Sequence, residues 1–454
     1  MPPYYVSSKP HNMTISKYHL ATAFAVLTSA LLFFSSCGSA EGRTETVEQA
    51  TSDDGTGLPA LMLRKGELAN SEEWPRVQAK DAELRDRIRR NTDDMKARIQ
   101  LATIFITEAR ITGEHPYYYP ATLKMLDVIL GKDPKNFEAM VYKASVLMSQ
   151  HQFAQAREVG LKARDINPAN AYVYGVLVDA NVELGQYEEA IRMSDSMQAL
   201  KPSLESYSRA SYLREIYGDY PGAIQAMKLA VEAGLPGSEP QSWSRNTLAY
   251  LYEKTGNLDR AEGEYRTILQ MRPSYAFALR GLARVYALRK EPDSAMRLLQ
   301  QAADIMPEFS FYEEMADLQA SRGDKAKANE GYREVIKMLG EDAASGHTVN
   351  LELCRVFTKM GALDSAAVYG AKEYAVRPQN IDVNAALAWI AHKRGDAAKA
   401  VEHMNVAMRT GSKDPELLWR ASEIERTAGN SSKSSSLLAQ AKKVNPGLDP
   451  TDFQ

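Results

Sequence analysis

Few residues of this sequence have the type and spacing that chemistry at a protein site requires. The seven histidines form no spaced ligand pair with another histidine, a cysteine or an aspartate on one helix face. The sequence contains no glycine-rich phosphate loop, nucleophile elbow or zinc-protease motif. It therefore predicts no catalytic residue, no metal site and no cofactor, and we expect a protein that is not an enzyme.

The two cysteines, Cys37 and Cys354, have different surroundings. Cys37 follows two serines at the end of an uncharged, mostly apolar run, Leu20 to Phe34, which Lys9 and Lys17 precede. This run is shorter than the roughly 18 residues that a membrane-spanning helix needs, and it is typical of the core of an export signal. Cys354 lies within a helical pattern, where a cysteine packs as a small hydrophobic residue.

The segment Leu32-Phe33-Phe34-Ser35-Ser36-Cys37-Gly38 resembles the lipobox of bacterial lipoproteins. This resemblance implies that residues 1–36 are a signal peptide and that Cys37 carries lipid and begins the mature chain. The alternatives are an uncleaved anchor and an ordinary secretory signal. Each buried lipid methylene contributes about 0.8 kcal/mol to membrane binding, so several chains would anchor the protein firmly. Because Cys37 would be lipidated, we expect no disulfide with Cys354.

The residue after the lipid-bearing cysteine bears on the location of the protein. Gly38 stands where an aspartate retains lipoproteins at the inner membrane in some species. The resemblance therefore implies a place in the cell envelope at the outer membrane, facing the periplasm. Residues 38–57 are rich in Ser, Thr, Gly, Glu and Asp and cannot bury enough apolar surface to fold. We predict a flexible tether over residues 37–78, followed by a charged leading helix over 79–96.

The overall composition is that of a soluble or repeat protein, with 44% apolar and 25% charged residues. The net charge of −3 and the even mixing of signs argue against nucleic acid as a partner. At 454 residues the chain exceeds the usual length of one compact domain. Length and composition therefore favour an array of repeats that recognises partners by shape and local chemistry.

A period of 34 residues runs through the sequence. Pro134, Pro168 and Pro202 are spaced at this interval, as are Pro273 and Pro307. An alanine stands 12 residues before the last four of these prolines. A glycine stands five residues before several alanines of this kind. These glycines are Gly185, Gly218, Gly256, Gly323, Gly361 and Gly395. A period of this length is typical of stacked helix pairs.

The pattern resembles the tetratricopeptide repeat, most clearly in WSRNTLAYLYEKTGNLDRAEGEYRTILQMRP from Trp243 to Pro273. The resemblance implies an all-α fold, a right-handed α-solenoid superhelix of about ten helix pairs over residues 97–448, with a tail at 449–454. The predicted units are 97–134, 137–170, 171–203, 204–238, 241–275, 276–308, 309–340, 347–380, 381–413 and 415–448.

Each position of the repeat has a physical role. Small residues, Ala249, Ala261, Ala283 and Ala295, are expected where paired helices cross. Large residues, Tyr252, Tyr265 and Tyr286, are expected to fill the gap to the next repeat. The glycines are expected to close the first helix in a left-handed conformation. After the prolines, Ser203, Ser274 and Asn380 are predicted to cap the next helix.

In this family the first helix of each pair lines a concave groove. Carrying the register over gives a protein-binding groove of Tyr212, Trp243, Asn246, Tyr250, Arg280 and Arg284. The same face includes Tyr172, Asp179, Glu215, Glu253, Arg355, Trp389 and His392. Arg280 and Arg284 stand at i and i+4, so both project from one helix face. The alternatives are that Trp243 and Tyr250 pack between helices, and that Glu253 neutralises one arginine.

The function implied is a membrane-anchored scaffold of the bacterial cell envelope that binds protein or peptide partners in the concave groove. Aromatic residues and arginine at groove positions are the usual anchors of such surfaces. The alternative is an accessory protein that regulates an envelope enzyme or a transport or assembly complex. Both functions need only a groove and an anchor, so the sequence does not separate them, and it leaves the oligomeric state open.

Overall fold

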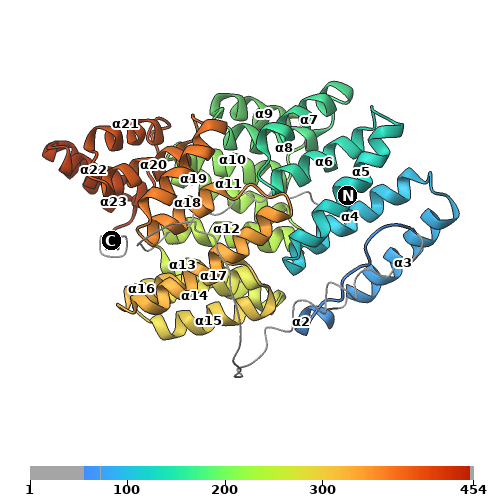
Figure 1. The fold of residues 1–454 in the computed structure, drawn as a ribbon, viewed down its shortest axis with the longest axis horizontal. Helices are drawn as coiled ribbons and strands as arrows, with labels where there is room; N and C mark the ends of the chain where they lie inside the picture. The colour runs from blue at the N-terminus through green and yellow to red at the C-terminus, as the bar shows by residue number, and fades with distance from the viewer. Residues whose placement is uncertain (1–55, 72, 450–454) are drawn as a thin grey trace, which may run out of the picture.

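The computed structural model describes residues 56–71 and 73–449, which form helices joined by short turns (Figure 1). The predicted signal peptide and Cys37 lie outside the described residues. None of the helices in the described part of the chain combines the length and the apolar character needed to cross a membrane.

In the described part of the chain, two helices precede the repeats: α2 (Gly66–Ala69) and α3 (Trp74–Arg90). Ten helix pairs follow, here called repeats 1 to 10 in chain order. They are α4 (Met95–Thr112) with α5 (His115–Lys132), α6 (Phe137–Ser149) with α7 (Phe153–Ile166), α8 (Ala171–Glu183) with α9 (Tyr187–Leu200), α10 (Leu204–Ile216) with α11 (Tyr220–Ala233), α12 (Glu239–Lys254) with α13 (Leu258–Met271), α14 (Ala276–Leu288) with α15 (Pro292–Ile305), α16 (Phe309–Ser321) with α17 (Lys325–Ala344), α18 (Asn350–Lys359) with α19 (Leu363–Val376), α20 (Ile381–Lys393) with α21 (Ala397–Ala407), and α22 (Pro415–Thr427) with α23 (Ser431–Val444).

The expected all-α solenoid of helix pairs is confirmed by this order. Its core is built from neighbours in sequence, since most buried apolar clusters join one repeat to the next. Ala249, Ala261, Ala283 and Ala295 are all buried where the helices cross. The ring of Tyr265 lies against Gly281 of the next repeat so closely that a methyl group there would come within 2.2 Å of it. Small residues thus allow the helices to approach, and large ones fill the space between repeats.

The turn between the two helices of each pair contains one residue with a positive φ. The six glycines predicted for this role have φ values between 66° and 82°, as expected. In repeats 2 and 6 a residue with a side chain occupies the place, His151 at φ 59° and Lys290 at φ 63°. Left-handed backbone costs a residue other than glycine about 1–2 kcal/mol. Both positions therefore hold strain that packing in the repeat must offset.

Two of the three predicted helix caps are found. The Ser203 side chain accepts from the backbone N–H of Ser206 and closes a capping box on α10. Asn380 accepts from the N–H groups of Asp382 and Val383 at the start of α20. The prediction for Ser274 is wrong, because the residue before α14 is Tyr275, which makes no side-chain cap.

The predicted tether is too long at its C-terminal end. Within residues 56–78, Leu58 is buried against the core of repeat 1, and α3 already begins at Trp74. Arg64 is buried and donates two hydrogen bonds to the Glu108 carboxylate of α4, at 2.9 and 2.7 Å. The leading helix accordingly occupies 74–90 instead of 79–96. The polar composition behind the tether prediction ends near Gly57, and the apolar residues beyond it cover the open end of repeat 1.

The array closes on itself after about five repeats. The turns of repeats 1–5 lie against the connections that follow repeats 6–10, and we call this contact the seam. Its two sides are Gly113, 150–152, Gly185, Gly218 and Gly256, which face Met306, 345–348, 377–380, 408–414 and Asn445. In Figure 1, α18–α20 lie beside α10–α12.

The seam has a regular hydrogen-bond register. Asn380 Nδ2 donates to the Glu183 carbonyl at 2.9 Å, and the Thr410 hydroxyl donates to the Ile216 carbonyl at 2.9 Å. Gln150 Nε2 donates to the Ser345 carbonyl at 3.2 Å. These pairs are 197, 194 and 195 residues apart in sequence. Because this separation is nearly constant, the turn of each of these repeats contacts the connection that follows the repeat five positions further along the chain.

Candidate functional site

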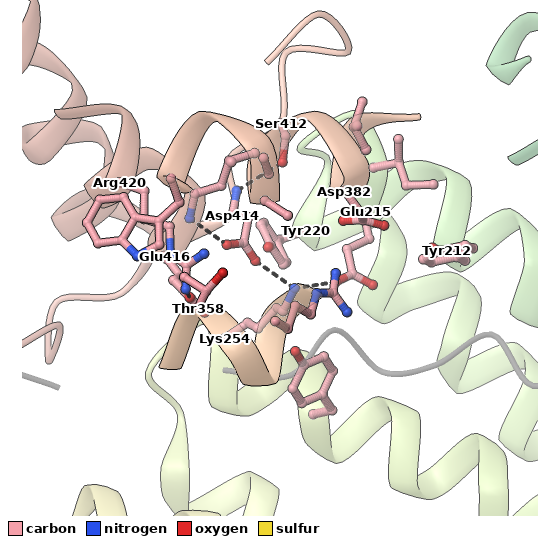
Figure 2. A pocket seen from close by; sticks show the side chains of 18 of the residues that line it. Tyr212, Glu215, Tyr220, Lys254, Thr358, Asp382, Ser412, Asp414, Glu416 and Arg420 are labelled. Atoms are coloured by element: carbon pink, nitrogen blue, oxygen red, sulfur yellow. Dashed lines mark hydrogen bonds and ion pairs between the residues drawn. The ribbon is translucent and has the colours of Figure 1, made fainter. Parts of the chain in front are cut away.

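A cavity of about 130 Å³ lies next to the seam, between the inner faces of the two halves of the array, repeats 1–5 and repeats 6–10 (Figure 2). One wall comes from repeats 4 and 5, through α10, α12 and the start of α11. The other wall comes from repeats 8–10, through α18, α20, α22 and the connection at 412–414. Closing the array thus converts part of the concave surface into a pocket with walls from both halves of the chain.

Lys254 joins the two walls. Its ammonium group lies 2.9 Å from the Glu215 carboxylate of α10 and 2.6 Å from the Asp414 carboxylate at the start of α22 (Figure 2). The side chain is 3% exposed. Burial alone would lower the pKa of Lys254, but Asp414 and Glu215 outweigh it and raise the pKa well above its usual value. Lys254 therefore stays charged and shares one positive charge between two carboxylates.

Further ion pairs stand around the cavity. Arg420 lies 2.5 Å from Glu416 on α22, and burial raises the pKa of that carboxyl group. Lys359 of α18 turns away, to Glu313 and Asp317 of α16 at 2.7 and 2.6 Å. Burial raises the pKa of Asp317 to about 7, against the opposing charge of Lys359. Most cations of the walls are thus already paired.

Three lining groups lack a polar partner among the described residues. The hydroxyl groups of Tyr220 and Tyr250 are buried and make no hydrogen bond, although both residues line the cavity. Arg355 of α18 lines it as well and has no ion pair. Burial raises the pKa of both tyrosines, so their hydroxyls are neutral and can donate or accept.

The structure brings some of the predicted groove residues to this cavity. Tyr212, Tyr250, Glu215, Arg355 and Trp389 line it. His392 stacks on Trp389 with ring centroids 4.8 Å apart. Trp243 is partly buried on α12, and Asn246 is buried with its side-chain oxygen unpaired, but neither lines the cavity. The register of the first helices thus identified residues on both walls of the cavity.

Arg280 and Arg284 do not form the predicted open patch. Arg284 lies 2.9 Å from Glu253, and Arg280 lies 2.7 Å from Glu314 of the next first helix. Both guanidinium groups are buried, at 3% and 9% exposure. This is the alternative in which Glu253 neutralises an arginine, and Glu314 pairs with the other. Each arginine therefore holds adjacent repeats together.

Lys254, Asp414, Glu416 and Arg420 were missed by the sequence prediction. Lys254 follows Tyr250 by four residues, so the helix register alone could have placed it on the same face. Asp414 could not be found in this way, because it lies in a connection 160 residues from Lys254. Its role depends on closure of the array.

A larger hollow of about 1010 Å³ lies mainly on repeats 1–3. It is lined by α3, α4, the starts of α6, α8 and α10, the connection at 167–170 and the last turn of α9. Its aromatic residues Phe137, Tyr142 and Tyr172 are partly exposed, and Leu200 at its edge is 43% exposed. Tyr172 is another of the predicted groove residues. Partly exposed aromatic side chains are what protein interfaces tend to use as anchors.

The repeat pattern is also recognised by comparison with known proteins. Residues 246–308, which span parts of repeats 5 and 6, match the family described as Tetratricopeptide repeat. The protein is built of tetratricopeptide repeats. Human mitochondrial import receptor subunit TOM70 is 23% identical over 220 residues, or 47% of this chain. This chain spans only 36% of the length of that receptor subunit.

Solved tetratricopeptide repeat structures resemble parts of the array. One from Parabacteroides merdae is 16% identical, with a TM-score of 0.40, and the match covers 54% of this chain and 93% of that one. A thermophilic tetratricopeptide repeat protein of Thermus thermophilus is 20% identical, with a TM-score of 0.37, over 42% and 97% of the two chains. The tetratricopeptide repeat fold is a scaffold for protein–protein interaction, and it hosts many unrelated roles.

Proposed function

We propose that this protein is a membrane-anchored scaffold of the bacterial cell envelope that binds a protein or peptide partner in the hollow of repeats 1–3. The observation that carries the proposal is the hollow itself, about 1010 Å³ with partly exposed aromatic residues. It is large enough for several residues of a partner, whereas the cavity beside the seam is not. The concave surface near the seam is already covered by the second half of the array, repeats 6–10.

The chemistry of the hollow favours an apolar or aromatic anchor. Ile99, Ile104 and Val141 supply aliphatic surface beside the aromatic residues, and Lys80, Lys96 and Lys201 stand among the lining residues with Glu138 and Glu205. Apolar surface at the centre of a patch with charged groups around it is the usual arrangement of a protein interface. A partner segment with one or two large apolar side chains and mixed charges would match this surface.

The test uses two leucines of equal exposure. Leu200→Glu puts a charge at the edge of the hollow, and Leu229→Glu puts the same charge on α11, away from the hollow; the two leucines are 43% and 41% exposed. Proteins crosslinked to the full chain in membranes are compared for the wild type and both variants. Leu200→Glu is expected to reduce recovery of a specific partner at least about tenfold, whereas Leu229→Glu leaves it unchanged. Equal partner lists for both variants would refute the proposed surface.

The membrane anchor is proposed from the sequence around Cys37. Cys37→Ala is expected to leave the repeats folded but to prevent processing to a lipid-bearing form. Mass spectrometry of the mature wild-type chain should find lipid on an N-terminal Cys37, and fractionation should place the chain in the outer membrane. A mature chain that begins elsewhere without lipid would contradict the anchor, although the partner surface would not be affected.

A further inference from the structure

Residues 58–64, here called the strap, lie on repeat 1 without forming a helix. Three side chains of α3 and α5 hydrogen-bond their main chain: the Tyr117 hydroxyl donates to the Ala60 carbonyl at 2.8 Å, the Tyr118 hydroxyl accepts from the Met62 N–H at 3.1 Å, and Arg85 donates to the Pro59 carbonyl at 2.5 Å. Among the described residues, no main-chain group bonds to the main chain of 58–63. The strap is thus held by side chains around it, as a bound peptide is.

The strap also inserts some of its side chains into repeat 1. Leu58 is 7% exposed and belongs to the core of that repeat, and Leu61 and Met62 pack against the same core. Leu63 is 73% exposed. Main-chain hydrogen bonds supply affinity for an extended segment, and pockets for particular side chains supply specificity. The surroundings of the strap therefore have both properties of a peptide-recognition site.

Arg64 makes the most specific contact of the strap. Its guanidinium lies 2.7 Å from the Glu108 carboxylate and 2.8 Å from the Glu73 carboxylate, and 5.0 Å from the centroid of the Trp74 ring. The side chains of Arg64 and Glu108 are 0% and 1% exposed. The two hydrogen bonds to Glu108 suit a guanidinium better than an ammonium group. If the strap left, Glu108 would stay buried without this partner, so the vacant site would favour another arginine.

The strap can leave repeat 1 without unfolding a helix pair. It is joined to α3 through α2, which has only four residues. Within repeat 1, α4 and α5 also pack on each other directly, since the rings of Phe105 and Tyr118 meet edge to face with centroids 5.1 Å apart. Release of the strap is therefore a local change.

We propose that repeat 1 carries a recognition site for an extended peptide, and that the strap occupies this site in cis. The ligand pattern is an apolar residue, two more apolar residues three and four positions later, and an arginine six positions after the first, as in Leu58, Leu61, Met62 and Arg64. A segment of a partner protein with this pattern takes the site in trans. The side chains that hydrogen-bond the strap do not line the hollow of repeats 1–3, so this is a second site, independent of the proposed function.

The strap sets a threshold for such partners. A segment tethered beside its site has an effective concentration on the order of 1 mM. A competing segment therefore binds the wild type more weakly than it binds the vacant site, in proportion to the small fraction of chains whose strap is released. The arrangement is an autoinhibited site that admits a tightly binding or locally concentrated partner.

The probe is a synthetic peptide with the sequence of residues 56–65, blocked at both ends and labelled with a fluorophore. The receptor is the full chain with Arg64→Glu, in which Glu108 and Glu73 repel the strap. Fluorescence anisotropy is expected to show that the peptide binds this variant at least about tenfold more tightly than the wild type, where the strap competes. A peptide that carries Arg64→Gln should bind the variant at least about tenfold more weakly.

Two double variants test the location of the site. Glu108→Gln added to Arg64→Glu is expected to weaken peptide binding at least about tenfold, because the peptide arginine loses its carboxylate. Glu83→Gln, at an exposed residue of α3, is the matched control and should leave binding unchanged. Circular dichroism melting curves establish that each variant is folded, and bound peptide should raise the melting temperature of Arg64→Glu.

The wild type provides a test that needs no variant. Unlabelled peptide at several millimolar, on the order of the effective concentration of the strap, is expected to displace the strap. The Met62 amide then loses its bond to Tyr118, and its hydrogen exchange should become faster.

Four results would overturn the proposal. The first is that the peptide, at up to about 1 mM, does not bind Arg64→Glu and that several millimolar peptide leaves strap exchange in the wild type unchanged. The second is equal affinity for the wild type and Arg64→Glu. The third is equal binding by the Glu108→Gln and Glu83→Gln double variants. The fourth is a wild-type dimer in light scattering that Arg64→Glu converts to a monomer, which would assign the site to the strap of a second copy. None of these results bears on the partner surface of repeats 1–3, which the Leu200→Glu experiment tests separately.

Discussion

Gly185 and Gly395 occupy the same place in repeats 3 and 9, with φ values of 75° and 77°. A methyl group at Gly185 would lie 2.4 Å from the backbone carbonyl of Gln379, across the seam. A methyl group at Gly395 would have no atom outside its own turn within 4 Å. Glycine therefore has two roles: it allows the left-handed backbone in eight of the ten turns, and in repeats 1, 3, 4 and 5 it also allows the close approach of the connections across the seam.

The same division applies to charged groups. Lys254 at the seam is buried between two carboxylates from different turns. Lys327, near the free turn of repeat 7, lies 3.1 Å from Asp324, and the two side chains are 67% and 35% exposed. Ion pairs that close the array are thus desolvated, whereas those at free turns remain in water. Four changes test this difference, in order of decreasing expected effect.

The largest effect is expected from Lys254→Met. Removing one partner of a buried ion pair costs about 3–5 kcal/mol, because the remaining charges are left buried without compensation. The matched change Lys327→Met should cost less than about 1 kcal/mol, since exposed pairs contribute little. Urea unfolding of both variants measures the difference. Equal losses of stability would mean that Lys254 is not held in a closed seam.

The second change compares the two glycines. Gly185→Ala and Gly395→Ala both force a side chain into left-handed backbone, at about 1–2 kcal/mol. Gly185→Ala should cost about 1–3 kcal/mol more, because its methyl group overlaps the Gln379 backbone. Hydrogen exchange should show the extra loss on both sides of the seam, at 183–187 and at 377–381. If exchange rises only within repeat 3, the two turns are not in contact there.

The third change concerns pH. His115 stacks on Tyr119 and faces His347 across the seam, and burial, followed by the charges of His347 and Arg110, lowers its pKa to about 3. The unfolded chain therefore binds a proton at His115 below about pH 6.5 that the folded chain does not bind. Stability is complete above this pH and falls as the pH drops toward 3. Urea midpoints between pH 7 and pH 4 should fall less for His115→Phe than for the wild type, and parallel curves would contradict the assignment.

The smallest effect is expected at a turn that lacks glycine. Lys290 has a φ of 63° in the turn of repeat 6, outside the seam. Lys290→Gly relieves left-handed strain but adds freedom to the unfolded chain, so a net gain below about 1 kcal/mol is expected. We predict that the melting temperature rises by a few degrees or less. A clear loss would mean that the Lys290 side chain contributes more than its backbone strain costs.

The repeat itself was predictable because its signals are local. The 34-residue period, the crossing alanines and the six turn glycines each act within one helix pair, and each takes the expected place. His151 and Lys290 were not predicted at left-handed positions, because neither residue type signals that conformation. Ser274 failed as a cap, since a serine after proline does not decide which residue begins the helix.

The seam could not be predicted in the same way. Its position depends on small rotations between repeats that add up over about 194 residues, and no single residue encodes that sum. Arg280 and Arg284 illustrate the result at short range. Their helix face was assigned, but whether they stay free depends on Glu253 and Glu314 of the neighbouring first helices. Likewise, Tyr250 and Asp414 line the same cavity only after the array has closed.

The long sequence separation of the seam also governs how the array folds. Contacts within a repeat form early, because the chain between them is short, whereas contacts 194 residues apart close a long loop and form late. During synthesis at about 5–20 residues per second, repeats 1–5 wait roughly 10–40 s for the connections that cover them. Through that interval the wall of α10 and α12 is exposed to solvent. A nascent chain thus passes through an open solenoid, and only the finished chain has the closed seam.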